Sequence, residues 1–244
     1  MNLLKNILGR IFALWALLAF AGSLLLYFIP VWITGLWPEP KRTIYVFKIF
    51  DIWMTTFFVL SGVKRRIIGK ENFKKGQVYV VVCNHNSFMD VPLSSSAIPG
   101  ANKTIAKEEM SKIPIFGTIY KRGSVLVNRK SEESRRTSYT KMKDVLKMGL
   151  HMCIYPEGTR NKSSQPLQRF HDGAFKLAIE SQKAVIPAVI FNTTKVLPTH
   201  KSFFFWPQPV EMHFLPAIDT TGRTTQDLKE QVFNLMKEYY TTHQ

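Results

Sequence analysis

Cysteine is scarce in this sequence, which limits how the chain can be stabilised. Only two cysteines occur, Cys83 and Cys153, each inside an apolar, strand-like run. Two such residues argue against a disulfide framework and favour buried free thiols in a reducing compartment. The histidines lack the spacing of metal ligands and the cysteines lack partner residues, so we expect no metal and no resident cofactor.

Acidic residues are also few. Lys and Arg number 33 against 17 Asp and Glu, which gives a net charge of +16. This excess suits a polyanion, an anionic membrane surface or a phosphorylated substrate. The positive charge is scattered, apart from Lys64–Arg66 and Arg135-Arg136, and no nucleic-acid motif occurs, so we expect no nucleic-acid partner. A membrane-tethered protein that binds another polyanion through its basic surface remains an alternative hypothesis.

Charge is absent from residues 11–29, and the apolar character continues after Pro30 to Trp37. Such a stretch is about long enough to cross a ~30 Å hydrocarbon layer. A cleavable signal peptide is the competing interpretation, because Ala19-Phe20-Ala21 resembles an A-x-A cleavage site. The apolar residues that follow this site would then have to be hidden by the mature protein, so we expect an anchor.

A second apolar stretch at 44–63 is interrupted by Lys48 and Asp51 and is rich in aromatic residues. Three positions separate the two charges, so they share one helical face and leave a broad apolar remainder, which is typical of a helix in the membrane interface. A core helix packed on a soluble domain is the alternative. Residues 1–63 are therefore predicted to form a two-helix membrane attachment, followed by a domain at 64–244.

From residue 65 onward, strand-like and helix-like segments alternate. This alternation predicts an α/β fold with a largely parallel mixed sheet flanked by helices. The predicted strands are 65–68, 78–84, 103–106, 124–128, 151–155, 185–191 and 209–215. The predicted helices are 88–97, 108–120, 132–148, 172–182 and 225–240. Chemistry in such sheets gathers where the strands end.

The run that ends at Cys83 is followed by His85 and, five positions later, by Asp90. Five positions on one helix would keep the two side chains apart. If the strand ends at His85 and a turn leads into a helix, Asp90 can return to the imidazole and orient it as a base. The alternative is a purely structural helix start, because Ser87 to Asp90 fits the [ST]-x-x-[DE] capping pattern.

Three more segments carry polar residues or proline at strand ends. Gly123 begins a predicted strand, and Arg129 follows the end of that strand. An arginine at this place can bind a phosphate bidentately, or it can remain a solvated charge. Tyr155 to Arg160 places Glu157 in a tight turn, where the alternative is a local Glu157–Arg160 ion pair. Pro187 inside an apolar run indicates an edge strand or a bulge, and its neighbours could line a channel for an acyl chain.

These blocks, in this order, resemble the four motifs of the glycerolipid acyltransferase family, and within it the PlsC-type 1-acyl-sn-glycerol-3-phosphate acyltransferases. The resemblance covers roughly residues 64–216. Tyr155 stands where phenylalanine is commoner, a departure with no obvious chemical effect. The matching blocks are His85-x4-Asp90, Gly123-x5-Arg129, Tyr155-Pro156-Glu157-Gly158-Thr159-Arg160 and Val185-Ile186-Pro187.

The resemblance implies roles for these residues. His85 would be the general base on the free hydroxyl of a lysolipid, and Asp90 would hold its tautomer. The hydroxyl would attack the acyl thioester directly, without an acyl-enzyme. The two arginines would bind the acceptor phosphate, the glutamate and glycine would shape that pocket, and Pro187 would be structural or line the acyl channel. The residues assigned to the phosphate site are Arg129, Glu157, Gly158, Thr159, Arg160 and Lys107.

The family further implies lysophosphatidic acid as acceptor, phosphatidic acid as product, and acyl-CoA or acyl carrier protein as co-substrate. Anionic membrane lipids would be contacted, at the cytoplasmic side of a bacterial inner membrane. Sister enzymes that use glycerol 3-phosphate, another lysophospholipid or an amino-acid lysolipid are alternatives, because the four blocks do not separate them. A metal-dependent phosphohydrolase built on His85 and Asp90 would lack a second pair of ligands. The oligomeric state is not indicated.

Overall fold

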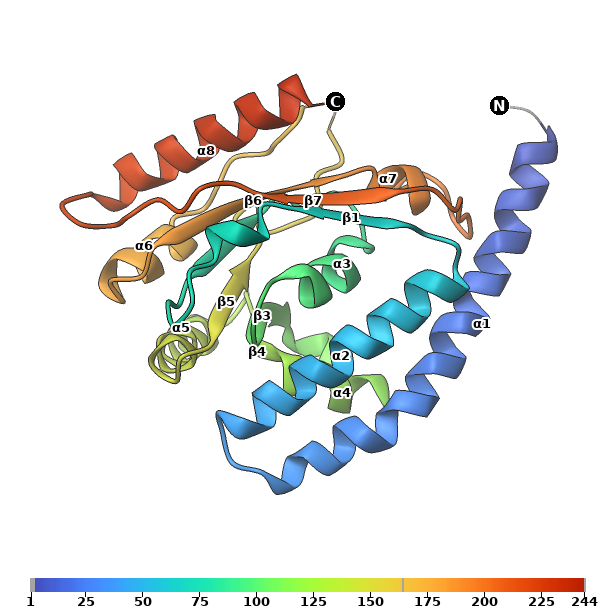
Figure 1. The fold of residues 1–244 in the computed structure, drawn as a ribbon, viewed down its shortest axis with the longest axis horizontal. Coiled ribbons are helices and arrows are strands. Elements are labelled where there is room, and N and C mark those ends of the chain that lie inside the picture. The colour runs from blue at the N-terminus through green and yellow to red at the C-terminus, as the bar shows by residue number, and fades with distance from the viewer. Residues whose placement is uncertain (1–2, 164, 244) are drawn as a thin grey trace.

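The computed structural model describes residues 3–163 and 165–243, which form a mostly parallel seven-stranded sheet with helices on both faces (Figure 1). The strand order is β1-β7-β6-β2-β5-β3-β4, and only the β6–β7 pair is antiparallel. The predicted fold class is therefore confirmed. The strands are β1 Arg65–Ile68, β2 Val80–Cys83, β3 Asn102–Lys107, β4 Ser124–Val127, β5 His151–Ile154, β6 Val185–Phe191 and β7 Val210–Phe214.

The central strands are apolar on both faces because helices cover both. Every residue of β2, β5 and β6 is buried, as expected for parallel strands inside a covered sheet. One core cluster joins the sheet to α1, α2 and α3, and the other joins it to α5, α6 and α8. The α-helices are α1 Leu3–Ile33, α2 Lys41–Leu60, α3 Asp90–Ala97, α4 Phe116–Gly123, α5 Glu132–Lys147, α6 Gly173–Glu180, α7 Thr193–Val196 and α8 Thr225–Thr242.

The single helix predicted over 108–120 is wrong. Residues Glu108–Lys112 form a short 3-10 helix (η3), and α4 begins only at Phe116. The physical reason is Pro114, which disfavours helical backbone at the residue before it. Ile115 then takes a positive φ of 63°, which separates the two helical segments. Two more short 3-10 helices, η1 Thr34–Leu36 and η2 Lys70–Asn72, complete the chain.

The sequence indicated either an edge strand or a bulge at Pro187, and the edge-strand interpretation is wrong. Pro187 belongs to β6, which lies between β7 and β2. The register with β7 shifts around it: Val185 pairs with Ile218, whereas Ala188 pairs with Phe214. Two residues of β6 therefore face three of the partner segment, as in a β-bulge, so the missing N–H of proline breaks no regular ladder.

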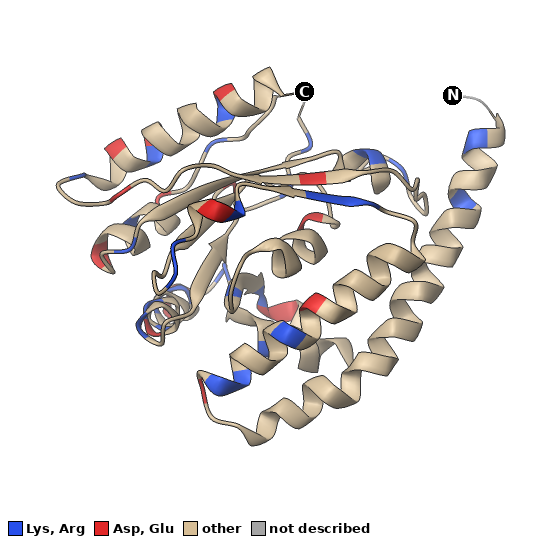
Figure 2. Ribbon diagram, viewed as in Figure 1, with Lys and Arg blue, Asp and Glu red and all other residues tan. Residues whose placement is uncertain are grey.

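Helices α1 and α2 are both long and apolar enough to cross a membrane. Past its N-terminal part α1 carries no charge, while Lys and Arg are spread over many other elements (Figure 2). Each helix buries one face in the protein and leaves large apolar side chains exposed on the other, for example Leu18 and Leu25 on α1 and Val59 on α2. This composition suggests membrane association. The boundary between an anchor at 1–63 and a domain at 64–244 stays a prediction.

Candidate active site

The carboxyl ends of the parallel strands bring the predicted site residues to one edge of the sheet. His85 follows β2, Arg129 follows β4, and Glu157 follows β5. Strands β2 and β5 are direct neighbours, and β4 is joined to them through β3. Side chains far apart in the sequence therefore meet at this edge, as expected for open parallel sheets.

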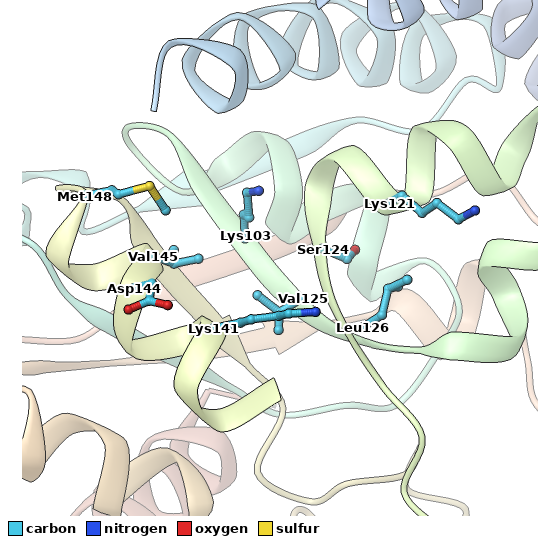
Figure 3. A pocket seen from close by; sticks show the side chains of 9 residues that line it. All are labelled: Lys103, Lys121, Ser124, Val125, Leu126, Lys141, Asp144, Val145 and Met148. Atoms are coloured by element: carbon cyan, nitrogen blue, oxygen red, sulfur yellow. The ribbon is translucent and has the colours of Figure 1, made fainter. Parts of the chain in front are cut away.

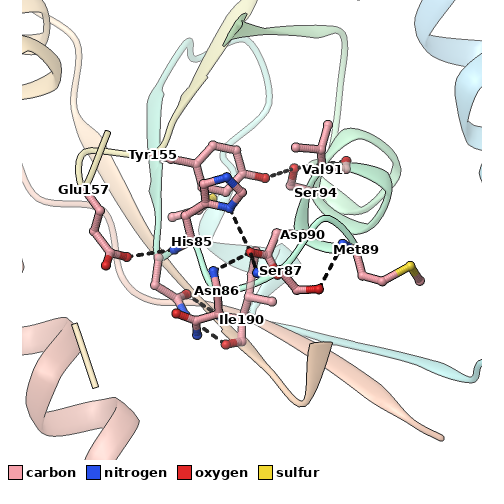
Figure 4. A network of polar contacts seen from close by, with 12 residues as sticks. His85, Asn86, Ser87, Met89, Asp90, Val91, Ser94, Tyr155, Glu157 and Ile190 are labelled. Carbon is pink, nitrogen blue, oxygen red and sulfur yellow. Dashed lines mark hydrogen bonds and ion pairs between the residues drawn. The ribbon is translucent and has the colours of Figure 1, made fainter. Parts of the chain in front are cut away.

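His85 and Asp90 form a hydrogen-bonded pair in which the Nδ1 to Oδ2 distance is 2.9 Å (Figure 4). The Asp90 side chain is fully buried, whereas the His85 side chain is 18% exposed. A carboxylate can only accept, so Nδ1 carries the proton and Nε2 is left as an acceptor. Because His85 lines the main cavity of the protein, this arrangement can take a proton from a bound hydroxyl.

The helix-start interpretation of Ser87 to Asp90 also describes part of the geometry. Asp90 is the first residue of α3, and its Oδ2 accepts the backbone N–H groups of Asn86 and Ser87 at 2.6 and 2.7 Å. The bond to Ser87 is the carboxylate half of a capping box, but the N-cap of α3 is Met89, which makes no side-chain cap bond. The same carboxylate oxygen thus fixes the turn and the imidazole, and the two interpretations are compatible.

Glu157 lies behind the site and does not line the cavity. Its side chain is buried, and its two oxygens accept the backbone N–H groups of His85 at 2.7 Å and Gln168 at 2.9 Å. Burial raises the pKa of Glu157 to about 7, although these two N–H donors act in the opposite direction. The carboxyl group thus holds the backbone beneath His85, and its predicted part in shaping the phosphate site stays a prediction. The alternative Glu157–Arg160 ion pair is not formed.

The cationic residues predicted for the phosphate site share the cavity with His85. Arg129 donates to the carbonyl of Gly158, and the guanidinium carbon of Arg160 lies 3.6 Å from the ring centroid of Phe88. Gly158 has a φ of 72°, which favours glycine at this turn. Lys107 and Thr159 are exposed at the same mouth. With Lys162, four cationic side chains line this cavity, and they suit an anionic group.

The main cavity has a volume of about 1130 Å³ and extends from these polar residues into an apolar interior. Its apolar walls come largely from the inner faces of α1 and α2, including Ala16, Phe20, Phe50 and Trp53. A cavity with one cationic end and a long apolar body suits an amphipathic anion. Pro187 is not among the described residues that line it, so of its two predicted roles, structural or channel-lining, this cavity favours the structural one.

A second cavity of about 380 Å³ lies between β4 and α5 (Figure 3). Three lysines border it, Lys103, Lys121 and Lys141, together with Asp144. Lys103 is already paired with Glu39 at 2.8 Å, and His85 is not part of the lining. We assign no chemistry to this cavity. Elsewhere in the described ranges, no group of three or more His, Cys, Asp or Glu side chains is placed to hold a metal ion.

Two asparagines that support the site were missed in the sequence. The side chain of Asn84 donates to the backbone oxygen of Ile190 at 3.0 Å and accepts its N–H at 2.7 Å, which ties the end of β2 to β6. The backbone N–H of Asn161 donates to the carbonyl of His85 at 2.6 Å. Asn84 directly precedes His85, but its partner is 106 positions away, so no local pattern reveals the contact.

The fold and the site agree with the comparisons to known proteins. Residues 64–191 match the sequence profile of the family described as Acyltransferase. This match covers more than half of the chain, and the chain belongs to that family. It is therefore an acyltransferase enzyme, and the resemblance drawn from the four blocks is confirmed.

Similar proteins carry a more specific name. Human 1-acyl-sn-glycerol-3-phosphate acyltransferase beta is 28% identical over 203 residues, which cover 82% of this chain and 72% of the human protein. The 1-acyl-sn-glycerol-3-phosphate acyltransferase of Borreliella burgdorferi is 26% identical over 180 residues, 73% of this chain and 71% of the relative. The crystal structure of PlsC, a 1-acyl-sn-glycerophosphate acyltransferase from Thermotoga maritima, superimposes with a TM-score of 0.78 at 23% identity. That match covers 99% of this chain and 97% of the other, and it supports the same fold.

Proposed function

We propose that this enzyme transfers an acyl group from a thioester donor to the free hydroxyl of 1-acylglycerol 3-phosphate, giving phosphatidic acid for phospholipid biosynthesis. The observation that carries the proposal is one cavity lined by the imidazole of the His85–Asp90 pair, by four cationic side chains and by a long apolar interior. The names of the similar proteins support this acceptor. Lysophosphatidic acid has the required features: a hydroxyl, a phosphate and one acyl chain.

In the proposed mechanism, Nε2 of His85 removes the hydroxyl proton as the hydroxyl oxygen attacks the thioester carbonyl. A new ester C–O bond forms, the C–S bond breaks, and the imidazolium returns the proton to the departing thiolate. Asp90 holds the tautomer and stabilises the imidazolium as it forms. Direct attack is supported by the hydrogen bonds of His85, because within the described ranges its ring bonds only Asp90 and no serine or cysteine.

The substrate would lie along the cavity according to its polarity. Arg129, Arg160 and Lys107 would hold the phosphate, and Gly158 and Thr159 would form the turn beside it. An acyl chain would occupy the apolar part between α1, α2 and α3. Acyl-CoA and acyl carrier protein both suit the basic mouth, since both carry phosphopantetheine. No metal or other cofactor takes part in the proposed chemistry.

The location proposed for the enzyme is the cytoplasmic side of a bacterial inner membrane. Exposed apolar side chains on α1 and α2 support a membrane attachment, and the basic surface suits anionic lipids. Two buried free thiols, Cys83 and Cys153, suit a reducing compartment.

An acyl-transfer assay with purified protein in mixed micelles tests the proposal. Lysophosphatidic acid, glycerol 3-phosphate and lysophosphatidylethanolamine are offered in parallel, each with acyl-CoA and with acyl carrier protein as donor. We expect lysophosphatidic acid to give the highest kcat/KM. His85→Ala should lower turnover by roughly 10²–10⁴-fold, whereas His243→Ala, a histidine outside the cavity, should not change it. Faster transfer to another acceptor, or full activity of His85→Ala, would contradict the proposal.

A further inference from the structure

The imidazole of His85 is held at its edge and also on its face. Asp90 holds the edge through Nδ1. The ring of Tyr155 covers the face, with the two ring centroids 4.4 Å apart and the planes inclined by 33° (Figure 4). Hydrogen bonding at the edge alone leaves the ring free to tilt about the bond to Asp90. A second contact on the face restricts that motion.

Tyr155 is itself tethered. Its hydroxyl lies 2.7 Å from Oγ of Ser94, and both side chains are buried, with 8% and 2% of their surface exposed. Asp90 and Ser94 are four positions apart on α3 and therefore lie on the same face of the helix, one turn apart. One side of α3 thus carries both Asp90, which holds the edge of the imidazole, and Ser94, which holds the Tyr155 ring that covers the imidazole.

The hydroxyl contact adds to the packing that confines the Tyr155 ring. Tyr155 follows β5, belongs to the buried core cluster beside Cys153 and Leu93, and also forms part of the wall of the large cavity. Phenylalanine, which the family motif more often carries here, would keep the ring and lose the hydrogen bond. The hydroxyl is therefore the part of Tyr155 that needs an explanation, and Ser94 supplies it.

We propose that Tyr155 is a positioning residue for His85 and that the Ser94 hydroxyl fixes it in place. Tyr155 acts through the imidazole: its ring limits the orientations of His85, and its π-face favours the charged imidazolium that forms during proton transfer. This inference rests on the proposed role of His85 as the base. It gives a physical role to the tyrosine that departs from the family motif.

Steady-state kinetics with lysophosphatidic acid and acyl-CoA test the tether. Tyr155→Phe and Ser94→Ala should each lower kcat by about fivefold and leave the KM for lysophosphatidic acid unchanged. A fivefold change is about what the loss of one hydrogen bond would cause if it raised the activation free energy by its full net contribution. Because both changes remove the same bond, the double variant should be no slower than either single variant. Tyr155→Leu, which removes the ring, should lower kcat by roughly a hundredfold, and Tyr155→Phe is the conservative variant that restores most of this loss.

Tyr139→Phe is the matched control, because the Tyr139 hydroxyl also makes a side-chain hydrogen bond, to Glu180 at 3.1 Å, but Tyr139 stands on α5 outside the cavity. Its kcat should equal that of the wild type. An unchanged kcat in Tyr155→Phe, or a loss of about 25-fold in the double variant, as two independent effects would give, would overturn the proposal.

A substrate-free measurement separates this inference from the proposed function. The Nδ1–H proton of His85, hydrogen-bonded to Asp90, should give a resolved downfield NMR signal in the wild type and in Tyr155→Phe. We expect this signal to be broadened or lost in Tyr155→Leu, because the imidazole is no longer confined. An intact signal in a folded Tyr155→Leu variant would refute the positioning role whichever lipid the enzyme acylates. Failure to acylate lysophosphatidic acid, with the expected NMR changes, would refute the proposed function alone.

Discussion

Replacing Glu157 by glutamine measures how strongly the site perturbs a buried carboxyl group. Burial raises the pKa of Glu157 from 4.5 to about 7. The folded state therefore holds this proton more tightly than the unfolded state does. The stabilisation that results is fully present below pH 4.5 and is lost as the pH rises through 7. A shift of this size corresponds to roughly 3 kcal/mol of unfolding free energy.

The wild type alone would not reveal this effect, because His151 titrates in the opposite sense. Burial lowers the pKa of His151 from 6.5 to about 4, and its Nδ1 accepts the backbone N–H of Tyr79 at 3.0 Å. Its contribution is present above pH 6.5 and is lost as the pH falls through 4, again by roughly 3 kcal/mol. Between pH 4.5 and 6.5 the two slopes nearly cancel.

Urea unfolding in detergent, followed by tryptophan fluorescence from pH 4.5 to 7.5, separates the two groups. Glu157→Gln loses one of two backbone acceptors, which costs about 1–3 kcal/mol at every pH. Beyond this constant offset, we expect the unfolding free energy of the variant to rise by roughly 3 kcal/mol relative to that of the wild type as the pH rises across this range. His151→Gln, whose amide oxygen can still accept from Tyr79, should show the opposite trend. A difference between wild type and Glu157→Gln that is independent of pH would refute the reasoning.

Two further changes test the cavity and the support of the site. A Cβ at Gly123 would lie 2.7 Å from Cε2 of Phe50, and both residues line the cavity. Gly123→Val should therefore shorten the cavity. For each methylene of the acyl donor that no longer fits, kcat/KM should fall by about fourfold. Assays with acyl donors of graded length measure this, and an unchanged length preference would contradict it. Asn84→Ala should leave both backbone groups of Ile190 unpaired and lower the unfolding free energy by roughly 2–4 kcal/mol. Urea unfolding measures this loss, with Ser138→Ala as the control. Equal unfolding free energies for the two variants would contradict the prediction.

The strands and the local turn of the site could be predicted from the sequence because their signals are local. Each of the seven predicted strands overlaps an observed one, since apolar runs bounded by polar residues are enough to define them. The approach of Asp90 to His85 followed from a strand, a turn and a helix start within six residues, and the 2.9 Å contact agrees with it. The catalytic role of the pair remains a proposal.

The rest depends on contacts between residues distant in the sequence. Glu157 looks like a pocket residue in a Pro-Glu-Gly turn, but its direction is set by the backbone N–H groups of His85 and Gln168. The contact from Tyr155 to Ser94 spans 61 positions, so the tyrosine had no visible function in the sequence. Local chemistry was also underestimated at Pro114, where one proline divided a helix that periodicity alone predicted to be continuous.

The hydrophobic N-terminus combines two roles that the sequence suggested only separately. Its outer face exposes large apolar side chains, whereas Ala13 and Ala16 of α1 and Trp53 of α2 are buried in the same core as the sheet and line the cavity. A cleavage after Ala21 would remove the two alanines and open the cavity wall. The two helices proposed to attach the enzyme to lipid thus also wall the cavity proposed to hold an acyl chain. Under the proposed function, a cavity walled by these helices would keep the acyl chain of an amphipathic substrate in an apolar environment while its phosphate lies at the cationic end.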